Sequence, residues 1–244
     1  MAQRKLTFSM LRVAALAMLV VAAHANSSSE RQSRSDRSDR SDDPEDGDNG
    51  GVACRDARLA TYTVTFESRW RESRERITEH FSAIIGWAHD GSSEGKHWRV
   101  GSRATRGIEL VAESGSNDQL LRELRDKERR GSVFDPEQKT EGHHEAPFSN
   151  LRWDITLDRD HTWANHVTMI APSGDWFLGD NRNLYRDGGW IEHVRDEVGT
   201  YDAGTEAGNE FKYDNRPTQE PISTLRRRLE NGPGTLTFRL KSCS

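Results

Sequence analysis

The chain has little cysteine, no excess of positive charge and few of the short motifs that mark enzymes. It holds 2 cysteines in 244 residues, and its formal net charge is −5 at pH 7. No basic field favours nucleic acid, so we expect no nucleic-acid partner. The sequence also lacks a P-loop and an H-E-x-x-H pair. We therefore expect a binding protein and not an enzyme.

Apolar residues are scarce and unevenly distributed. Hydrophobic residues make up 33% of the chain and charged residues 31%, which is polar for a globular protein. All 7 tryptophans lie between Trp70 and Trp190. The part of the chain after residue 51 is long enough to bury a core. We expect one folded domain there.

The first 25 residues have the pattern of a secretory signal peptide. Arg4 and Lys5 precede an apolar stretch at 13–23, which is too short to span a bilayer. Ala23-His24-Ala25 fits a cleavage site with small residues at both ends. An uncleaved anchor is the alternative. The sequence thus predicts a signal peptide at 1–25 and a secreted, extracellular protein, in which membrane contact is not expected.

Residues 26–51 form a polar segment with a Ser-Arg-Ser-Asp repeat from Ser33 to Asp42. Such a segment cannot offset its ordering entropy by burying apolar surface. An Arg-Ser repeat can bind RNA, but the alternating aspartates cancel the positive charge here. We expect a disordered, solvated linker over 26–51.

Hydrophobic periodicity predicts mostly strands in the rest of the chain. Alternating or continuous apolar runs predict strands at 60–66, 151–157, 166–171 and 235–240. The apolar run at 82–88 fits either a strand or a buried loop. Helices are predicted at 118–130 and 190–198, each followed by glycine. This pattern indicates an all-β fold with short inserted helices, arranged as an antiparallel β-sandwich.

Cys54 and Cys243 stand at the two ends of this folded part. In an oxidising compartment an even pair is typical of a disulfide, and two separate buried thiols are the alternative. A bridge closing so long a loop would stabilise the fold by roughly 5 kcal/mol. Neither cysteine has a partner at metal-ligand spacing.

Two blocks carry the strongest functional signal. Met169–Gly179 reads MIAPSGDWFLG, and Tyr201–Gly208 reads YDAGTEAG. Together they resemble the spondin domain, and the resemblance extends over about 53–225, including the strand at 60–66. It implies a β-sandwich related to C2 domains over 52–244, with a Ca²⁺ ion held among loops at one end.

By this resemblance, Asp175, Asp202 and Glu206 stand at the family's metal-binding positions. Calcium takes oxygen ligands from carboxylates, carbonyls and water, and carboxylates on glycine-containing turns suit it. The alternative is that Asp175 and Asp202 only hydrogen-bond their own turns. A fourth family ligand would fall near Thr156, with Asp154 and Asp158 on the same face.

The chain departs from the family pattern at several positions. Gly174 replaces a usual proline, and Glu206 replaces a usual aspartate. The family commonly pairs its first cysteine with one after the first block, where this chain has Tyr185. Cys54 must therefore pair with Cys243 or stay free.

Weaker candidates have a plain structural explanation beside the functional one. His143-His144-Glu145 fits a solvated loop better than a ligand set, and His161 with His166 is a weak metal signal. Trp176 and Phe177 can form a contact surface, but core packing is favoured. Arg226–Arg228 can bind an acidic polysaccharide or simply end a solvated helix.

The resemblance predicts a secreted, monomeric, calcium-binding adhesion module that recognises an extracellular protein or glycan. A C2-type binder of anionic lipid is one alternative, although the acidic net charge counts against it. A metal-dependent hydrolase is the other, and the sequence offers it no established catalytic motif.

Overall fold

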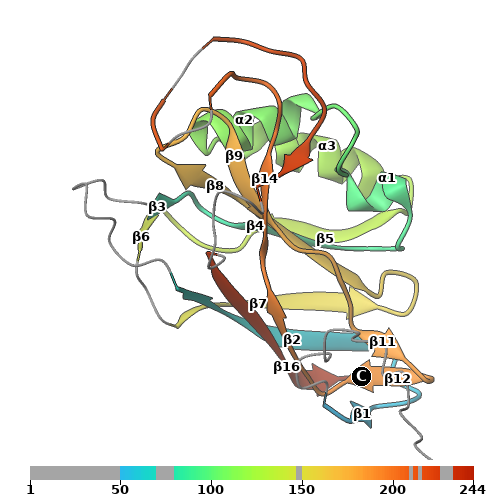
Figure 1. Cartoon of the computed structure of the whole chain (residues 1–244). Helices are drawn as coiled ribbons and strands as arrows, with labels where there is room; N and C mark the ends of the chain where they lie inside the picture. Colours follow the sequence, from blue (N-terminus) through green and yellow to red (C-terminus); the bar gives the residue numbers. More distant parts are fainter. Residues whose placement is uncertain (1–49, 70–79, 147–149, 209–210, 214–215, 226–232) are drawn as a thin grey trace, which may run out of the picture. The chain divides into compact units, whose positions relative to one another are not determined.

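The computed structural model describes residues 50–69, 80–146, 150–208, 211–213, 216–225 and 233–244 (Figure 1). The expected signal peptide, the linker up to residue 49, Trp70 and Arg226–Arg228 lie outside the described residues. Within the described ranges, no helix has both the length and the apolar character needed to cross a bilayer.

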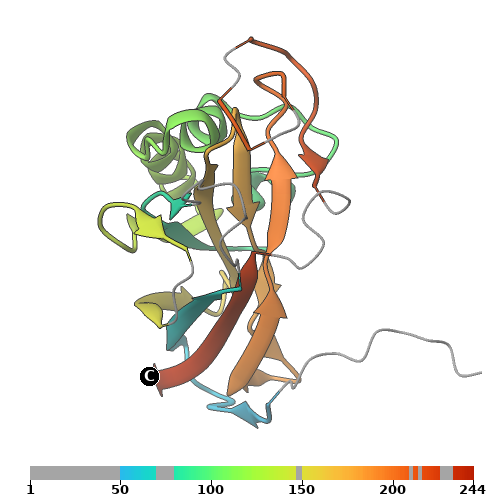
Figure 2. The same cartoon turned by 60° about the vertical axis from the view of Figure 1, so that its left-hand side comes forward.

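Two antiparallel sheets dominate the described part of the chain (Figures 1 and 2). The four-stranded sheet has the order β13-β16-β2-β7. The nine-stranded sheet follows the path β15-β14-β9-β8-β3-β6, with β4 and β10 paired to β8 and β5 paired to β4. A small third sheet has the order β1-β12-β11. This architecture confirms the expected antiparallel β-sandwich.

The strands of the four-stranded sheet are β2 (Leu59–Ser68), β7 (Leu151–Asp158), β13 (His193–Glu197) and β16 (Gly234–Cys243). The nine-stranded sheet contains β3 (His80–Phe81), β4 (Ile85–His89), β5 (Val133–Gln138), β6 (His144–Glu145), β8 (Trp163–Ala171), β9 (Trp176–Gly179), β10 (Arg182–Asn183), β14 (Gly199–Asp202) and β15 (Ser223–Thr224). The small sheet contains β1 (Val52–Ala53), β11 (Tyr185–Arg186) and β12 (Gly189–Ile191). The helices are α1 (Ser93–Lys96), α2 (Arg106–Ser114) and α3 (Asp118–Glu128).

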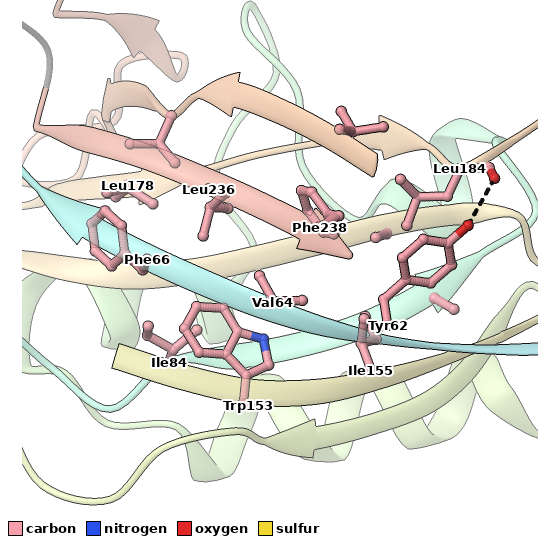
Figure 3. Close-up of a cluster of buried hydrophobic side chains, with 14 of the residues drawn as sticks. Tyr62, Val64, Phe66, Ile84, Trp153, Ile155, Leu178, Leu184, Leu236 and Phe238 are labelled. Atoms are coloured by element: carbon pink, nitrogen blue, oxygen red, sulfur yellow. Dashed lines mark hydrogen bonds between the residues drawn. The ribbon is translucent and has the colours of Figure 1, made fainter. Parts of the chain in front are cut away.

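The main core lies between the two large sheets and follows from alternation along β2. Tyr62, Val64 and Phe66 are fully buried, whereas the threonines between them are half-buried. These side chains meet Leu178 of β9 and other apolar residues from the facing sheet (Figure 3). The Tyr62 hydroxyl donates to the Leu184 carbonyl at 3.2 Å and the Ile191 carbonyl at 2.8 Å. Burial of this polar group is therefore compensated.

A second core lies between the nine-stranded sheet and the helices. Helix α2 packs on β8 and β9, and α3 packs on β5 (Figure 2). Side chains alternate along β9, so Trp176 joins the main core and Phe177 joins the second one. Their side chains are 2% and 0% exposed. The expectation that both belong to the core is confirmed.

Helix α2 was not expected from the sequence, although its ends carry ordinary signals. The Thr105 hydroxyl accepts from the Ile108 amide at 3.3 Å, which caps the first turn. Gly115 ends the helix with a φ of +67°, which favours glycine. Helix α3 confirms the prediction at 118–130, two residues shorter at its C-terminal end.

The predicted helix at 190–198 is wrong. Residues 189–191 form β12, and residues 193–197 form β13, which pairs with β16 from His193↔Arg239 to Glu197↔Thr235. Ile191, Val194 and Val198 have helix-like spacing and are all buried. These side chains are buried from extended backbone because β1 pairs with β12 and β16 pairs with β13. Tertiary pairing here overrides the local pattern.

Cys54 and Cys243 form a disulfide, with Cα atoms 6.4 Å apart. Cys54 follows β1, and Cys243 ends β16. The alternative of two separate thiols is thus excluded. The bridge ties the beginning of the described fold to its end.

Candidate functional site

The two sequence blocks meet because β9 pairs with β14. Asp202, the last residue of β14, lies opposite Trp176, the first residue of β9. Asp175 immediately precedes β9, so it lies beside the loop that leaves β14. The Ala203 amide donates to the Asp175 backbone carbonyl at 3.0 Å. The pairing therefore brings Asp175 and the 203–206 segment together.

The Asp175 carboxylate is buried and binds backbone amides. It is 1% exposed. Its Oδ2 accepts from the amides of Thr205 at 2.7 Å and Glu206 at 3.0 Å. A buried carboxylate needs such donors because an unpaired charge would be costly. Asp175 thus fixes the loop that carries Glu206.

Asp202 shapes the first turn of the same loop. Its Oδ1 accepts from the Gly204 amide at 2.9 Å. Gly204 has a φ of +73°, and a Cβ there would lie 2.3 Å from the Glu220 carbonyl oxygen. The loop then returns toward β15, and the Glu220 amide donates to the Gly204 carbonyl at 2.8 Å. Glycine is required at 204 for both conformation and space.

Carboxylates line two clefts beside this loop. One cleft, of about 500 Å³, contains Asp202, Glu206 and Glu220 together with Val100 and Ile222. The other cleft, of about 490 Å³, is lined by residues of α2 and of the loop and therefore lies between them. Glu206 and Glu220 border both clefts. Acidic residues thus border this loop in both clefts.

Glu109 and Glu113 of α2 add to this acidic region, together with Arg103 as a basic neighbour. Burial raises the pKa of Glu113, and nearby Glu109 and Asp175 act in the same direction, whereas a hydrogen bond with Thr205 opposes them. Sequence reasoning missed both glutamates. Their i, i+4 spacing was the available signal, but it has no meaning until α2 is placed beside the loop.

The three predicted metal ligands lie in one neighbourhood, but they do not form a closed ligand cluster. Among the described residues, no three His, Cys, Asp or Glu side chains are grouped closely enough to hold a metal ion. The donor set consists of oxygen atoms, which suits calcium. Asp175 and Asp202 each use one carboxylate oxygen on loop amides. The contacts that the structure shows for Asp175 and Asp202 are therefore those that stabilise the turn.

The residues expected to include a fourth ligand lie on β7 of the other large sheet. Asp154 accepts from Thr63 at 2.8 Å and from Lys241 at 2.5 Å. The hydroxyl groups of Thr156 and Thr61 are 3.2 Å apart. These contacts join β7 to β2 and to β16 of the same sheet. Asp158 binds the ring of His161, with 2.8 Å between Oδ1 and Nδ1.

His166 belongs to a buried polar network. Its Nε2 accepts from Trp153 Nε1 at 3.0 Å, and its Nδ1 lies 3.1 Å from Asp180 Oδ1. The Trp153 bond leaves Nδ1 as the nitrogen that carries the proton. His161 also binds the Gly131 carbonyl. Both histidines therefore have structural partners of their own.

One short stretch, Gly91–Gly95, matches the G-x-S-x-G pattern of serine hydrolases, which sequence reasoning overlooked. Its central Ser93 is exposed and begins the four-residue helix α1. Neighbouring His89 has both ring nitrogens engaged, with the Gly91 amide and with Asn181. A nucleophile needs a nearby base, and this arrangement directs His89 away from Ser93.

Comparisons with known proteins agree with this architecture. The Spondin_N family model matches residues 60–238. Spondin-1 of Gallus gallus is 30% identical over 187 residues, which cover 70% of this chain and 23% of Spondin-1. Spondin-2 of Homo sapiens is 28% identical over 182 residues, which cover 69% of this chain and 53% of Spondin-2.

The chain thus spans about a quarter of Spondin-1 and about half of Spondin-2. The family match begins in β2 and ends in β16, so it includes both large sheets and the loop between β14 and β15. This chain belongs to the spondin family.

Proposed function

We propose that this chain is a secreted recognition module that binds calcium at the loop between β14 and β15 and recognises an extracellular protein or glycan. Asp175, Asp202 and Glu206 supply the carboxylates. The observation that supports this most directly is the shared position of Asp202, Glu206 and Glu220 on one cleft. Negative groups gathered on one cleft favour a cation there.

Asp175 supports the proposal in a different way. Its bonds to the Thr205 and Glu206 amides hold the segment that carries Glu206. A loop already ordered loses less entropy when it binds a ligand. A calcium ion would supply positive charge that compensates the carboxylates and fixes the loop in one conformation. The partner would then meet a rigid edge of the sandwich.

The calcium site is tested by thermal unfolding of the full chain in EDTA and then in excess calcium. A ligand at 100 times its Kd stabilises by about 2.7 kcal/mol. For a domain of this size that corresponds to a rise in Tm of roughly 5–10 °C. The Asp202→Asn and Glu206→Gln variants should lose most of this rise. Asparagine can still accept from the Gly204 amide, so the turn is retained.

Glu141→Gln is the matched control, because Glu141 is exposed and lies in the loop between β5 and β6. It should respond to calcium as the parent does. An unchanged Tm of the parent in calcium, or an equal response in all three variants, would refute the calcium site.

Recognition is tested separately on arrays of matrix proteins and glycans, with and without calcium. The parent should retain a partner in calcium, and Glu206→Gln should retain it weakly. Binding that is equal in calcium and in EDTA would place recognition away from this loop.

A further inference from the structure

A second polar cleft lies beside the turn between α2 and α3, and none of its lining residues belongs to the calcium proposal. It has a volume of about 500 Å³. Its lining includes Ser116 of that turn, Asn117 and Asp118 at the start of α3, and Gln138 of β5. Pockets of roughly 300–1,000 Å³ are typical of small-ligand sites. The cleft therefore has room for a small ligand beside groups that can hydrogen-bond it.

Helix α3 begins at this cleft without a side-chain cap. Asparagine at the N-cap position normally accepts a hydrogen bond from one of the first helical amides, but the Asn117 side chain makes no such bond. The amide of Leu121 donates to the Asn117 carbonyl at 3.0 Å and so closes the first turn. The amides of residues 118–120 have no carbonyl of a preceding turn to bind. They are therefore donors at the helix end that borders the cleft.

The side chain of Asn117 provides a buried acceptor at the same place. Asn117 is 7% exposed. Its Nδ2 donates to the Ala83 carbonyl at 3.2 Å and to Gln138 Oε1 at 3.0 Å, which fixes the orientation of the amide. Its Oδ1 is buried without a hydrogen-bond partner among the described residues. Buried acceptors in folded proteins are nearly always bonded, so this oxygen indicates a donor that a ligand supplies.

The combination of donors with an acceptor selects the class of ligand. A cation fits poorly, because the positive end of the α3 dipole lies there. An anion fits poorly, because the Asp118 carboxylate and Asn117 Oδ1 border the same cleft. A saccharide fits, because each of its hydroxyl groups can both donate and accept a hydrogen bond.

We infer that this cleft binds a neutral saccharide, one hydroxyl of which donates to Asn117 Oδ1 while another accepts from the first amides of α3. Oδ1 is covered in the free chain, so the sugar must displace neighbouring side chains. Ser116 and Asp118, on either side of Asn117, are both exposed and can turn away. The site uses no residue of the calcium loop and needs no metal.

The inference is tested on the full chain in EDTA, by NMR titration with a panel of neutral monosaccharides and disaccharides at millimolar concentration. EDTA removes calcium, so a failure of the calcium proposal does not affect the result. At least one sugar should shift the backbone amide signals of residues 118–120 and the side-chain amide signals of Asn117. Binding by no sugar of the panel, or shifts confined to other parts of the chain, would overturn the inference.

Ser116→Phe is the deciding variant, because Ser116 is exposed and lines the cleft. The phenylalanine ring fills the cleft, so sugar binding should be lost while the melting temperature stays unchanged. Ser93→Phe is the matched control, since Ser93 is exposed and does not line this cleft, and it should bind sugar as the parent does. Equal binding by Ser116→Phe and the parent would also overturn the inference.

Asn117→Ala tests the acceptor itself. This variant loses one hydrogen bond to the sugar, so its affinity should fall by roughly 2–10-fold. It also loses the bonds to Ala83 and Gln138, so its melting temperature is measured first. If the folded variant binds sugar as tightly as the parent, Oδ1 is not the acceptor and the inference fails.

Discussion

Replacing Asp175 with alanine should destabilise the domain even when calcium is absent. The Asp175 carboxylate is buried and receives the amides of Thr205 and Glu206. Hydrogen bonds to a charged group contribute roughly 1.5–3 kcal/mol each, so their combined loss costs about 3–6 kcal/mol. Asp202→Ala removes the bond from the Gly204 amide at a half-buried position. Loss of this bond should cost about 1.5 kcal/mol, the low end of the same range, because water screens a half-buried charge.

The assay is chemical unfolding of both variants and the parent in EDTA, with the m-value compared to verify that the unfolded states are alike. Asp175→Asn is the companion variant, because its amide oxygen can still accept from both loop amides. Its loss should lie between those of the parent and Asp175→Ala. If Asp175→Ala unfolds in EDTA within about 1 kcal/mol of the parent, the amide contacts do not stabilise the loop, and the reasoning fails.

Four further variants probe the fold. Gly204→Ala should cost at least about 2 kcal/mol of stability, because alanine at positive φ costs about 1–2 kcal/mol and its Cβ would meet the Glu220 carbonyl. Gly142 has a φ of +67° and open space around it, so Gly142→Ala should cost only about 1–2 kcal/mol, from the unfavourable φ. Burial lowers the pKa of His89 to about 4, so stability should fall by about 3 kcal/mol as the pH drops from 6.5 through 4. In urea titrations at each pH, His89→Asn should show a weaker dependence of stability on pH than the parent. Cys243→Ser should lower the stability of the parent by up to about 5 kcal/mol, and a reducing agent should remove the difference.

The sign of the His89 prediction follows from its surroundings. The buried ring disfavours a charge, although Asn181 partly opposes this effect. The folded state thus resists protonation, whereas the unfolded chain accepts a proton near pH 6.5. The contribution of neutral His89 to stability is fully present above that pH and is lost as the pH falls. Constant stability between pH 7 and pH 4 in the parent, relative to His89→Asn, would contradict this explanation.

Local sequence determined the elements whose pattern agrees with their surroundings. Alternation along 60–66 places Tyr62, Val64 and Phe66 on one face of any strand, and they form the core wherever that strand packs. The leucine stripe of 118–130 likewise fits only a helix with one buried side. The two motif blocks indicated the family because a motif can be recognised from the order of its residues, without knowledge of the fold.

The tertiary structure decided what depends on partners distant in the chain. The segment 190–198 became extended because β1 and β16 offer it strand edges, which no local pattern reveals. Asp175 became an acceptor for loop amides only when β9 and β14 paired. His80 and Glu145 lie opposite each other because β3 and β6 pair across a long separation in sequence. Periodicity records which face a side chain occupies, whereas pairing decides which faces meet, and functional groups gather only where faces meet.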